Sequence, residues 1–354
     1  MAYSTLTIIG GINRPQPSLQ LSNTYERVTT NVSVLGISST KAYGRNVVNG
    51  HYMTSADGVN WTDEVFLPAT YTPNALEIIV DEENGYMYAL PSTAKLYRAP
   101  LDDFDNWTEI QPPTLPENTV GRSGNLKTDG TYLYYGNYNG NTEDRAHVYK
   151  SDDFGATWTE VLTLADGKHI HSIYIDDNDS ANIFVMVGDA NDADKGLWIS
   201  NDYGETWTHA ADNWYGINMV QQAATDITPE RLVYEGDGQN VPHVMDYLYS
   251  SISSTDDINA TILYYTYEYD GNWLGTTRAI ALTPSGDLFY VTTRESGGIV
   301  GAEKDALWLA KGPDFQRQYL LEDITGNEFA YYHTKVFNGY LLINRYRIEI
   351  PTFA

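Results

Sequence analysis

Short apolar runs alternate with turn-forming residues along almost the whole chain. The segments 76–80, 183–187 and 288–291 each hold four or five consecutive residues rich in β-branched, aromatic or other large apolar side chains. Gly, Asn and Asp separate such runs from one another, as they do between short strands. No segment keeps apolar residues at helical spacing over three turns. The pattern therefore predicts an all-β chain built from many short strands.

One turn sequence recurs between these strands. The string Ser-x-Asp-x-Gly-x-Thr-Trp occurs at 151–158 and again at 200–207. A less exact copy lies at 55–62 and a degenerate copy at 102–108. We call this string the turn cassette. Its tryptophans fall at 61, 107, 158 and 207, in steps of 46, 51 and 49 residues. A period near fifty residues indicates an array of repeated supersecondary units.

The cassette has a physical interpretation as a hairpin turn. An Asp carboxylate accepts hydrogen bonds from nearby backbone N–H groups, and the Gly adopts a positive φ. The Trp then returns the chain to a strand and supplies a large apolar face. We therefore expect structural roles, and no catalytic ones, for the following cassette residues: Asp57, Trp61, Asp103, Trp107, Asp153, Gly155, Trp158, Asp202, Gly204 and Trp207.

The cassette resembles the Asp-box, also called the BNR repeat, of sialidase-like β-propellers. The resemblance implies four-stranded antiparallel sheets standing as blades around a central axis, an arrangement that leaves only short exposed edges. The number of repeats predicts a single propeller domain over residues 1–354 with seven blades, six being the alternative. We expect an early apolar segment at 6–9 to pair with the C-terminal strands and close the ring.

Composition narrows the classes of partner and location. The 354 residues include 47 acids and 21 bases, and the net charge of −26 disfavours nucleic acid and anionic membranes as partners. The absence of cysteine excludes disulfides, thiolate metal sites and a cysteine nucleophile. No apolar run approaches the length of a membrane span, and the first ten residues lack the features of a signal peptide. We expect an extracellular or virion protein.

Two histidines on one predicted strand are the sharpest candidates for chemistry. His169 and His171 lie two residues apart, so both side chains face the same side of a strand. His147 lies on the strand that precedes a cassette. Three interpretations fit these residues: acid–base catalysis or contact with a glycan, a metal site, and hydrogen-bonded side chains that line the central channel.

Other candidates lie in polar loops near the starts of predicted inner strands. A Gly- and Asn-rich loop follows residue 136, an aromatic pair occupies 214–215, and three acids occur between 189 and 194. We expect no resident cofactor; Ca²⁺ at the three acids and Zn²⁺ at the histidines are the alternatives, although the acids lack EF-hand spacing. The candidate ligand-binding residues are Asn137, Asn141, Arg145, Asp189, Trp214, Asp237 and His243.

Residues 130–245 also resemble, more distantly, phage BNR proteins and the lyases that act on ulvan-type uronate polymers. The matching segments are 136–138, 145–151, 169–171, 187–189, 226–228 and 234–237. The resemblance implies that His and Tyr transfer protons while Arg binds the uronate carboxylate. It gives a candidate catalytic set of His147, His169, His171, Tyr215 and Arg231.

Three functions are compatible with these features. The first is a glycan-recognising or structural propeller without catalysis, carried as a tail, fibre or surface component of a phage or virus particle, with cell-surface glycans and other virion proteins as partners. The second is a polysaccharide lyase that cleaves a uronate polymer by β-elimination. The third, an exo-sialidase, is disfavoured because no arginine triad is identifiable and 13–15 lacks the Ile of an Arg-Ile-Pro segment.

Overall fold

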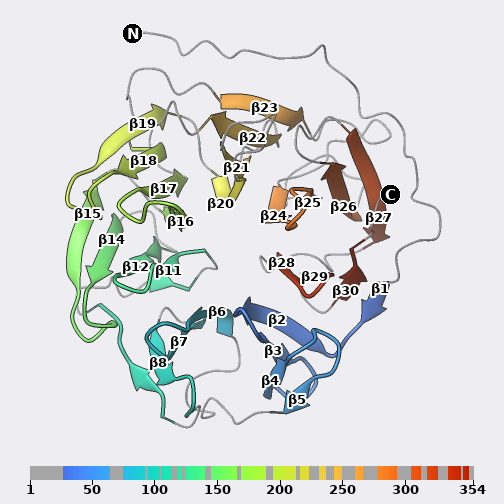
Figure 1. Cartoon of the computed structure of the whole chain (residues 1–354). Coiled ribbons are helices and arrows are strands. Elements are labelled where there is room, and N and C mark those ends of the chain that lie inside the picture. The colour runs from blue at the N-terminus through green and yellow to red at the C-terminus, as the bar shows by residue number, and fades with distance from the viewer. Residues whose placement is uncertain are drawn as a thin grey trace.

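In this computed structural model, all regular structure is β-strand in the residues that are described. These are 27–63, 75–91, 95–103, 106–112, 119–121, 124–139, 145–165, 169–188, 194–212, 216–222, 231–236, 243–248, 260–265, 277–292, 304–311, 317–325, 334–343 and 346–350. They contain no helix that could cross a membrane. The strands stand as sheets around one central axis (Figure 1), which confirms the predicted all-β propeller of four-stranded antiparallel blades.

Within the described ranges the strands pair into seven sheets, which we number in chain order. The first holds β2 (Val32–Ile37), β3 (Ala42–Asn46), β4 (Tyr52–Ser55) and β5 (Thr62–Asp63). The second holds β6 (Ala75–Asp81), β7 (Tyr86–Pro91), β8 (Tyr97–Pro100) and β9 (Thr108–Glu109). The third holds β11 (Leu126–Thr128), β12 (Leu133–Gly136), β14 (Ala146–Ser151) and β15 (Thr159–Leu164).

The fourth sheet departs from the four-stranded plan. Its blade strands are β16 (His169–Ile175), β17 (Ile183–Gly188), β18 (Gly196–Ser200) and β19 (Thr208–Asp212). Two short strands, β13 (Tyr138–Asn139) and β10 (Thr119–Val120), extend the sheet beyond β16. Because β16 is the innermost strand of the blade, the extension lies on the side of the sheet toward the axis.

The remaining sheets return to four strands. The fifth holds β20 (Gly216–Gln222), β21 (Arg231–Gly236), β22 (His243–Leu248) and β23 (Ala260–Tyr265). The sixth holds β24 (Thr277–Leu282), β25 (Leu288–Thr292), β26 (Lys304–Lys311) and β27 (Arg317–Thr325). The seventh holds β28 (Thr334–Phe337), β29 (Tyr340–Ile343), β30 (Tyr346–Glu349) and β1 (Arg27–Thr29).

Strands from the two ends of the chain meet in the seventh sheet. β1 pairs antiparallel with β30, in a register that places Arg27 opposite Ile348 and Thr29 opposite Tyr346. The pairing joins the first sheet to the last through backbone hydrogen bonds, without a covalent link. The segment 6–9, which we expected to make this contact, lies outside the described residues.

The hydrophobic core lies between neighbouring sheets. Tyr149 packs with Tyr88 and Leu90 of the second sheet. Val148, the residue before it, packs with Ile170 and other residues of the fourth sheet. Successive side chains of a strand point to opposite faces, so each blade contributes to two cores. The cassette tryptophans 61, 107, 158 and 207 each pack against one of these inter-sheet clusters.

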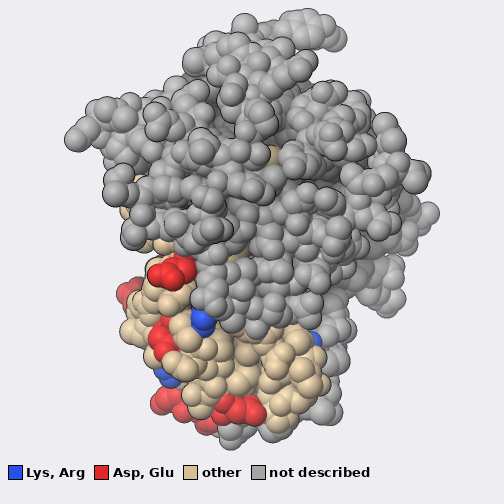
Figure 2. Space-filling view, turned by 90° about the vertical axis from the view of Figure 1, so that its right-hand side faces the viewer, with Lys and Arg blue, Asp and Glu red and all other residues tan. Residues whose placement is uncertain are grey.

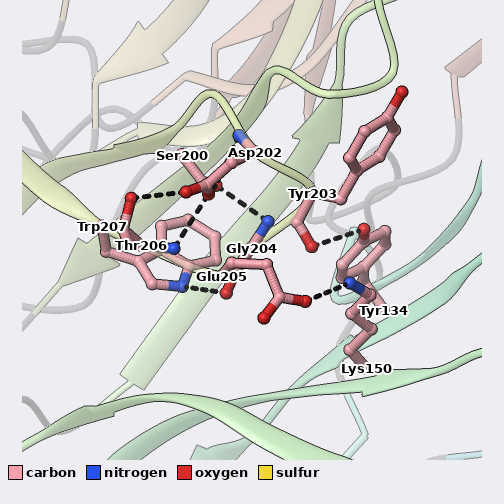
Figure 3. A network of polar contacts seen from close by, with 9 residues as sticks. All are labelled: Tyr134, Lys150, Ser200, Asp202, Tyr203, Gly204, Glu205, Thr206 and Trp207. Carbon is pink, nitrogen blue, oxygen red and sulfur yellow. Dashed lines mark hydrogen bonds and ion pairs between the residues drawn. The ribbon is translucent and has the colours of Figure 1, made fainter.

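The two complete cassettes form closed sets of hydrogen bonds, and Figure 3 shows the one at 200–207. The Ser200 hydroxyl donates to the Asp202 carboxylate at 2.8 Å and accepts from the Gly204 N–H at 2.8 Å. The Thr206 N–H and hydroxyl donate to the same carboxylate at 2.8 and 2.6 Å. The cassette at 151–158 repeats these contacts. The carboxylate is therefore engaged in shaping the turn.

The two divergent cassettes keep parts of this arrangement. In the copy at 55–62 the backbone N–H and the side-chain amide of Asn60 both donate to the Asp57 carboxylate, at 2.7 Å each. Asn60 thus takes the place of the Thr hydroxyl in a turn that is one residue shorter. In the degenerate copy at 102–108 the Asn106 amide donates to the Asp103 carboxylate.

The alternation of strand direction gives the ring two distinct faces. The cassettes and the turns that join first to second strands lie at one face, which we call the cassette face; the Tyr203 N–H, for example, donates to Ala181 O at 3.1 Å. The connections from second to third strands, and from one sheet to the next, lie at the opposite face, the loop face. Each inner strand begins at the loop face, where the candidate residues concentrate.

Candidate functional site

The described candidates near the junction of the third and fourth sheets lie at the loop face. They are Asn137, Arg145, His147, His169 and His171, on β12 to β14 and at the start of β16. Asn141, Asp189, Trp214, Tyr215 and Asp237 lie outside the described residues. The side chains of Arg231 and His243 are also outside the description, although their backbones belong to β21 and β22.

Three rings stack at the loop face, and we call Tyr138, His169 and His171 the aromatic stack. The Tyr138 and His169 ring centroids are 4.1 Å apart with an interplanar angle of 12°. His171 lies 6.1 Å from His169 and 6.0 Å from Tyr138, again with nearly parallel rings. The extra strand β13 brings Tyr138 opposite His169. The sequence predicted the two histidines as site residues but did not predict Tyr138.

A β-bulge sets the position of His171. Ile170 pairs with Val187 and Ser172 with Met186, so His171 is the extra residue between them. Its side chain is fully buried. The ring lies over Gly188, where an added Cβ would sit 1.9 Å from His171 Cε1. The site therefore depends on the missing side chain at 188.

A buried side-chain amide and a backbone hydrogen bond join the third and fourth sheets next to the stack. The Asn125 side chain donates to Gly136 O at 3.0 Å and to Ile170 O at 2.7 Å. The Ile170 N–H in turn donates to Asn137 O at 3.0 Å. Buried polar groups of this kind satisfy backbone groups that no neighbouring strand can reach. Nothing in the local sequence marks Asn125 for this role.

Asn137 has a structural role, whereas the sequence predicted that it binds a ligand. Its side chain is fully buried, donates to Arg145 O at 3.0 Å and accepts from the His147 N–H at 2.6 Å. The amide therefore bridges the chain across the 137–147 segment, where we expected it to contact a ligand. Arg145 itself is exposed at the loop face.

The side chain of His147 points away from the aromatic stack. Its ring lies 5.9 Å from that of Tyr149, on the face of the third sheet that packs toward the second. Val148 occupies the opposite face, toward the fourth sheet. His147 Nδ1 is 3.1 Å from a Glu160 carboxylate oxygen. The structure therefore separates His147 from the other two histidines of the candidate set.

The backbone of Arg231 lies at the opposite face of the ring. β21 begins at Arg231, which pairs with Gln222 at the cassette face, and ends at Gly236, which pairs with Gly216 at the loop face. A strand of this length spans about 17 Å. Arg231 therefore starts at the far end of its sheet from the face that carries His169, and the predicted grouping of these residues needs correction.

A metal centre is not apparent in the described part of the chain. There, no three His, Asp or Glu side chains are placed to hold one ion. Two of the three acids suggested for Ca²⁺, Asp189 and Asp192, are outside the described residues. The described residues do offer a set of nearly parallel aromatic side chains at the loop face of the propeller, and two of these side chains are partly exposed.

Comparison with known proteins identifies the fold of this chain but matches the chain to no protein family. No protein-family model and no curated protein matches the chain. Among solved structures, the GH74 xyloglucanase from Xanthomonas campestris is 16% identical over 84% of this chain and 47% of its own, with a TM-score of 0.55. A GH74 enzyme from Niastella koreensis is 17% identical over 83% and 46%, at 0.56. YCF48 from Cyanidioschyzon merolae is 11% identical over 92% and 98%, at 0.54.

These likenesses establish a β-propeller and nothing finer. The chain spans slightly less than half the length of the two GH74 enzymes, 47% and 46%. Likeness at these identities shows the fold alone, so function has to be argued from the site.

Proposed function

We propose that this protein is a glycan-recognising β-propeller of the Asp-box type, with the loop face beside the aromatic stack as its carbohydrate-binding surface. The Asp-box assignment is supported by the shared hydrogen bonds of the cassettes at 55–62, 151–158 and 200–207. The likeness in fold to a xyloglucanase supports a role that involves glycans.

The observation that carries the proposal is the stacking of His169 on Tyr138. Aromatic rings present flat apolar faces with polar edges, and these complement sugars, which combine C–H faces with hydroxyl rims. Tyr138 and His169 both keep partial exposure, while His171, whose ring lies 6.1 Å from that of His169, is buried. The net charge of −26 favours a neutral glycan over a polyanion.

The described geometry gives less support to a lyase. β-Elimination needs a base, an acid and a group that neutralises the carboxylate, all around one sugar. Arg231 begins its strand at the cassette face, and His147 pairs with Glu160 on the other side of its sheet. Among the described members of the catalytic set, His169 and the buried His171 lie beside the proposed surface. Display on a phage or virus particle stays a prediction from sequence.

Affinity electrophoresis of the full chain against neutral and uronate polysaccharides tests the proposal. We expect at least one neutral glycan to retard the protein, and His169→Ala and Tyr138→Ala to weaken the retardation about tenfold or more. His51→Ala is the matched control, because it removes a histidine that is paired with Asp63 in the first sheet. Retardation by no glycan, or equal retardation of all variants, would contradict the proposal. Growth of ultraviolet absorbance from an unsaturated uronate would favour the lyase instead.

A further inference from the structure

Asparagine followed by glycine occurs at three turns within the described ranges: 49–50, 84–85 and 338–339. In such a pair the backbone nitrogen of the glycine can attack the side-chain carbonyl carbon of the asparagine, because glycine has no Cβ to hinder the approach. The reaction expels the side-chain nitrogen and converts the amide to an acid. Whether a folded protein permits it depends on how firmly the two reacting groups are held.

The pair at 84–85 is restrained through its asparagine. The Asn84 side-chain amide donates to both carboxylate oxygens of Asp81, at 3.1 and 2.9 Å, and to Gly130 O in the next sheet. The Asn84 N–H also donates to the Asp81 carboxylate at 3.1 Å. These contacts have to break before the side-chain carbon of Asn84 can turn toward the nitrogen of Gly85.

The pair at 49–50 is restrained at both reacting groups. The Gly50 N–H, which carries the attacking nitrogen, donates to Asn46 O at 2.8 Å. The side-chain oxygen of Asn49 accepts from the His51 N–H at 3.0 Å. The turn between β3 and β4 therefore holds the nitrogen and the carbonyl carbon in place.

The pair at 338–339 is the most weakly held of the three. It forms the two-residue turn between β28 and β29, with φ of 48° at Asn338 and 81° at Gly339, as a type I′ turn requires. Both residues are exposed, and an added Cβ at Gly339 would meet no atom within 4 Å. The Asn338 amide donates to Ala56 O, an exposed carbonyl 2.9 Å away. Local opening of this turn therefore breaks one side-chain hydrogen bond and meets no steric obstacle at Gly339.

We propose that Asn338 is a site of spontaneous deamidation, with water as the co-reactant. The Gly339 nitrogen loses its proton to solvent base and attacks Asn338 Cγ. The bond from Cγ to Nδ2 breaks, ammonia leaves, and a cyclic succinimide remains. Water then opens the succinimide: hydrolysis at Cγ gives aspartate, and hydrolysis at the backbone carbonyl carbon gives isoaspartate, in which the chain continues through the side chain.

The position of Asn338 gives this reaction a consequence for the propeller. Its turn belongs to the seventh sheet and Ala56 to the cassette of the first sheet, so the hydrogen bond between them crosses the junction that closes the ring. A carboxylate has no hydrogen to donate, and its oxygens would face the Ala56 oxygen. Isoaspartate also adds an atom to the backbone of a two-residue turn. The product therefore weakens the junction between the first and the seventh sheets.

The new negative charge adds to an existing excess. Acidic side chains line the lower edge of the described surface on the side shown in Figure 2, and the whole chain carries −26. Repulsion among like charges destabilises a compact state. The replacement of a neutral amide by a carboxylate at 338 therefore acts in the same direction as the loss of the hydrogen bond to Ala56.

Ageing of the full chain in mildly alkaline buffer, below its unfolding temperature, tests the site. Peptide mass spectrometry measures the conversion of each asparagine to aspartate or isoaspartate. We expect Asn338 to react tenfold or more faster than Asn84, because two more contacts hold the Asn84 amide. Asn338 should also react faster than Asn49, since the Gly50 nitrogen is engaged. No conversion at Asn338, or equal conversion at the other two sites, would overturn the proposal.

The same chain in urea is the control for local sequence. All three sites have the same Asn-Gly pair, so their rates should converge once the native contacts are lost. If the three rates kept their native order in urea, the neighbouring residues rather than the fold would select Asn338, and the structural assignment would be wrong.

Substitution tests the effect on the junction. Asn338→Asp should lower Tm by about 2 °C, the cost of one hydrogen bond in a chain of this size. Asn49→Asp is the matched control, because it adds the same charge and keeps an oxygen that can accept from the His51 N–H. An equal fall in both variants, or no fall in Asn338→Asp, would contradict the role assigned to the contact with Ala56. The turn at 338–339 lies at the cassette face, so these results are independent of glycan binding at the loop face.

Discussion

The phenolic hydroxyl of Tyr134 donates a hydrogen bond to the backbone oxygen of Tyr203, 3.0 Å away in the next sheet (Figure 3). Tyr203 is the fourth residue of its cassette and has a φ of 58°. Phe154, at the same position one sheet earlier, has a φ of 59°, and its oxygen accepts from the Arg98 guanidinium at 2.8 Å. The cassette therefore joins neighbouring blades as well as the two strands of its own hairpin.

A cation strengthens each of these inter-blade contacts. Lys150 pairs with Glu205 at 2.9 Å and lies 4.2 Å from the centre of the Tyr132 ring, which in turn contacts Tyr203. In the preceding pair of sheets, Arg98 lies 4.7 Å from the centre of the Tyr86 ring, which contacts Phe154. The same arrangement of aromatic ring, cation and carbonyl thus recurs with different residues.

Tyr134→Phe should destabilise the protein by about 1 kcal/mol, because it removes the donor to Tyr203 O and leaves that contact without a replacement. Tyr88→Phe is the matched control: its hydroxyl is buried and accepts or donates no hydrogen bond within the described part of the chain. We expect Tyr88→Phe to be neutral or stabilising. Urea unfolding measures both, and equal losses in the two variants would contradict the role assigned to the Tyr134 hydroxyl.

Glycines in the turns between strands should differ in their tolerance of alanine. Gly85, Gly155 and Gly204 all have positive φ, so a side chain at any of them costs about 1 kcal/mol in backbone strain. At Gly155 an added Cβ would also lie 2.6 Å from Ile110 Cδ1, whereas at Gly204 the nearest atom is 3.5 Å away and at Gly85 none is within 4 Å. We therefore expect Gly155→Ala to lose the most stability.

Shortening Ile110 provides the test of that explanation. Ile110→Val removes the Cδ1 atom that the new Cβ would strike, so it should recover part of the loss in Gly155→Ala and none in Gly85→Ala. A double-mutant cycle measures the coupling directly. Additive effects of the two substitutions would show that the cost at Gly155 is strain alone.

Stability should fall as the cassette aspartates are protonated. Burial raises the pKa of the Asp153 carboxyl, but hydrogen bonds from Thr157 and Ser151 outweigh it and leave the pKa below its usual 3.8. A lowered native pKa contributes stability above the unfolded-state pKa, and this contribution is lost as pH falls through the native pKa. We expect this loss to begin as pH falls below about 4.

Asparagine variants separate this contribution from general acid unfolding. Asp153→Asn should lower stability at neutral pH and flatten the decline below about pH 4. Asp152→Asn, at the exposed neighbouring position, should leave both unchanged. Denaturant unfolding at a series of pH values makes the measurement. Parallel curves for wild type and Asp153→Asn would refute the assignment.

Gly188→Ala should disturb the aromatic stack without removing any ring. The new Cβ would lie 1.9 Å from His171 Cε1, so the imidazole has to move. We expect changed NMR shifts for the His169 and His171 ring protons and weaker glycan retardation. Gly85→Ala serves as the control, since it adds a Cβ with no neighbour within 4 Å. Unchanged ring shifts would mean that His171 is not held against Gly188 as described.

The architecture was largely predictable because its signals are local. A strand requires only a few consecutive residues of suitable type, and the cassette places its Asp, Gly and Thr within one turn. The hairpins between β14 and β15 and between β18 and β19 therefore lie where the sequence predicts them. The six-stranded fourth sheet was not predictable, because the pairing of Tyr138 with His169 joins a two-residue strand to another blade.

The candidate site was predictable only in part, for the same reason. The spacing of His169 and His171 indicates a shared side of one strand, and their rings do lie 6.1 Å apart. Their neighbour Tyr138, and the Asn125 amide beneath them, come from other strands. The direction of β21 places the backbone of Arg231 at the cassette face. The pleat of β14 turns the side chain of His147 toward the second sheet.

By itself, the sequence determined that the chain forms repeated β-hairpins around structural aspartates, because periodicity and turn chemistry operate over a few residues. Only the tertiary structure decided which side chains meet across sheets: the stack of Tyr138, His169 and His171, and the hydrogen bond from Tyr134 to Tyr203. These contacts depend on strand register and on the order of blades around the ring. Neither the register of the strands nor the order of the blades is encoded in the spacing of residues along a single strand.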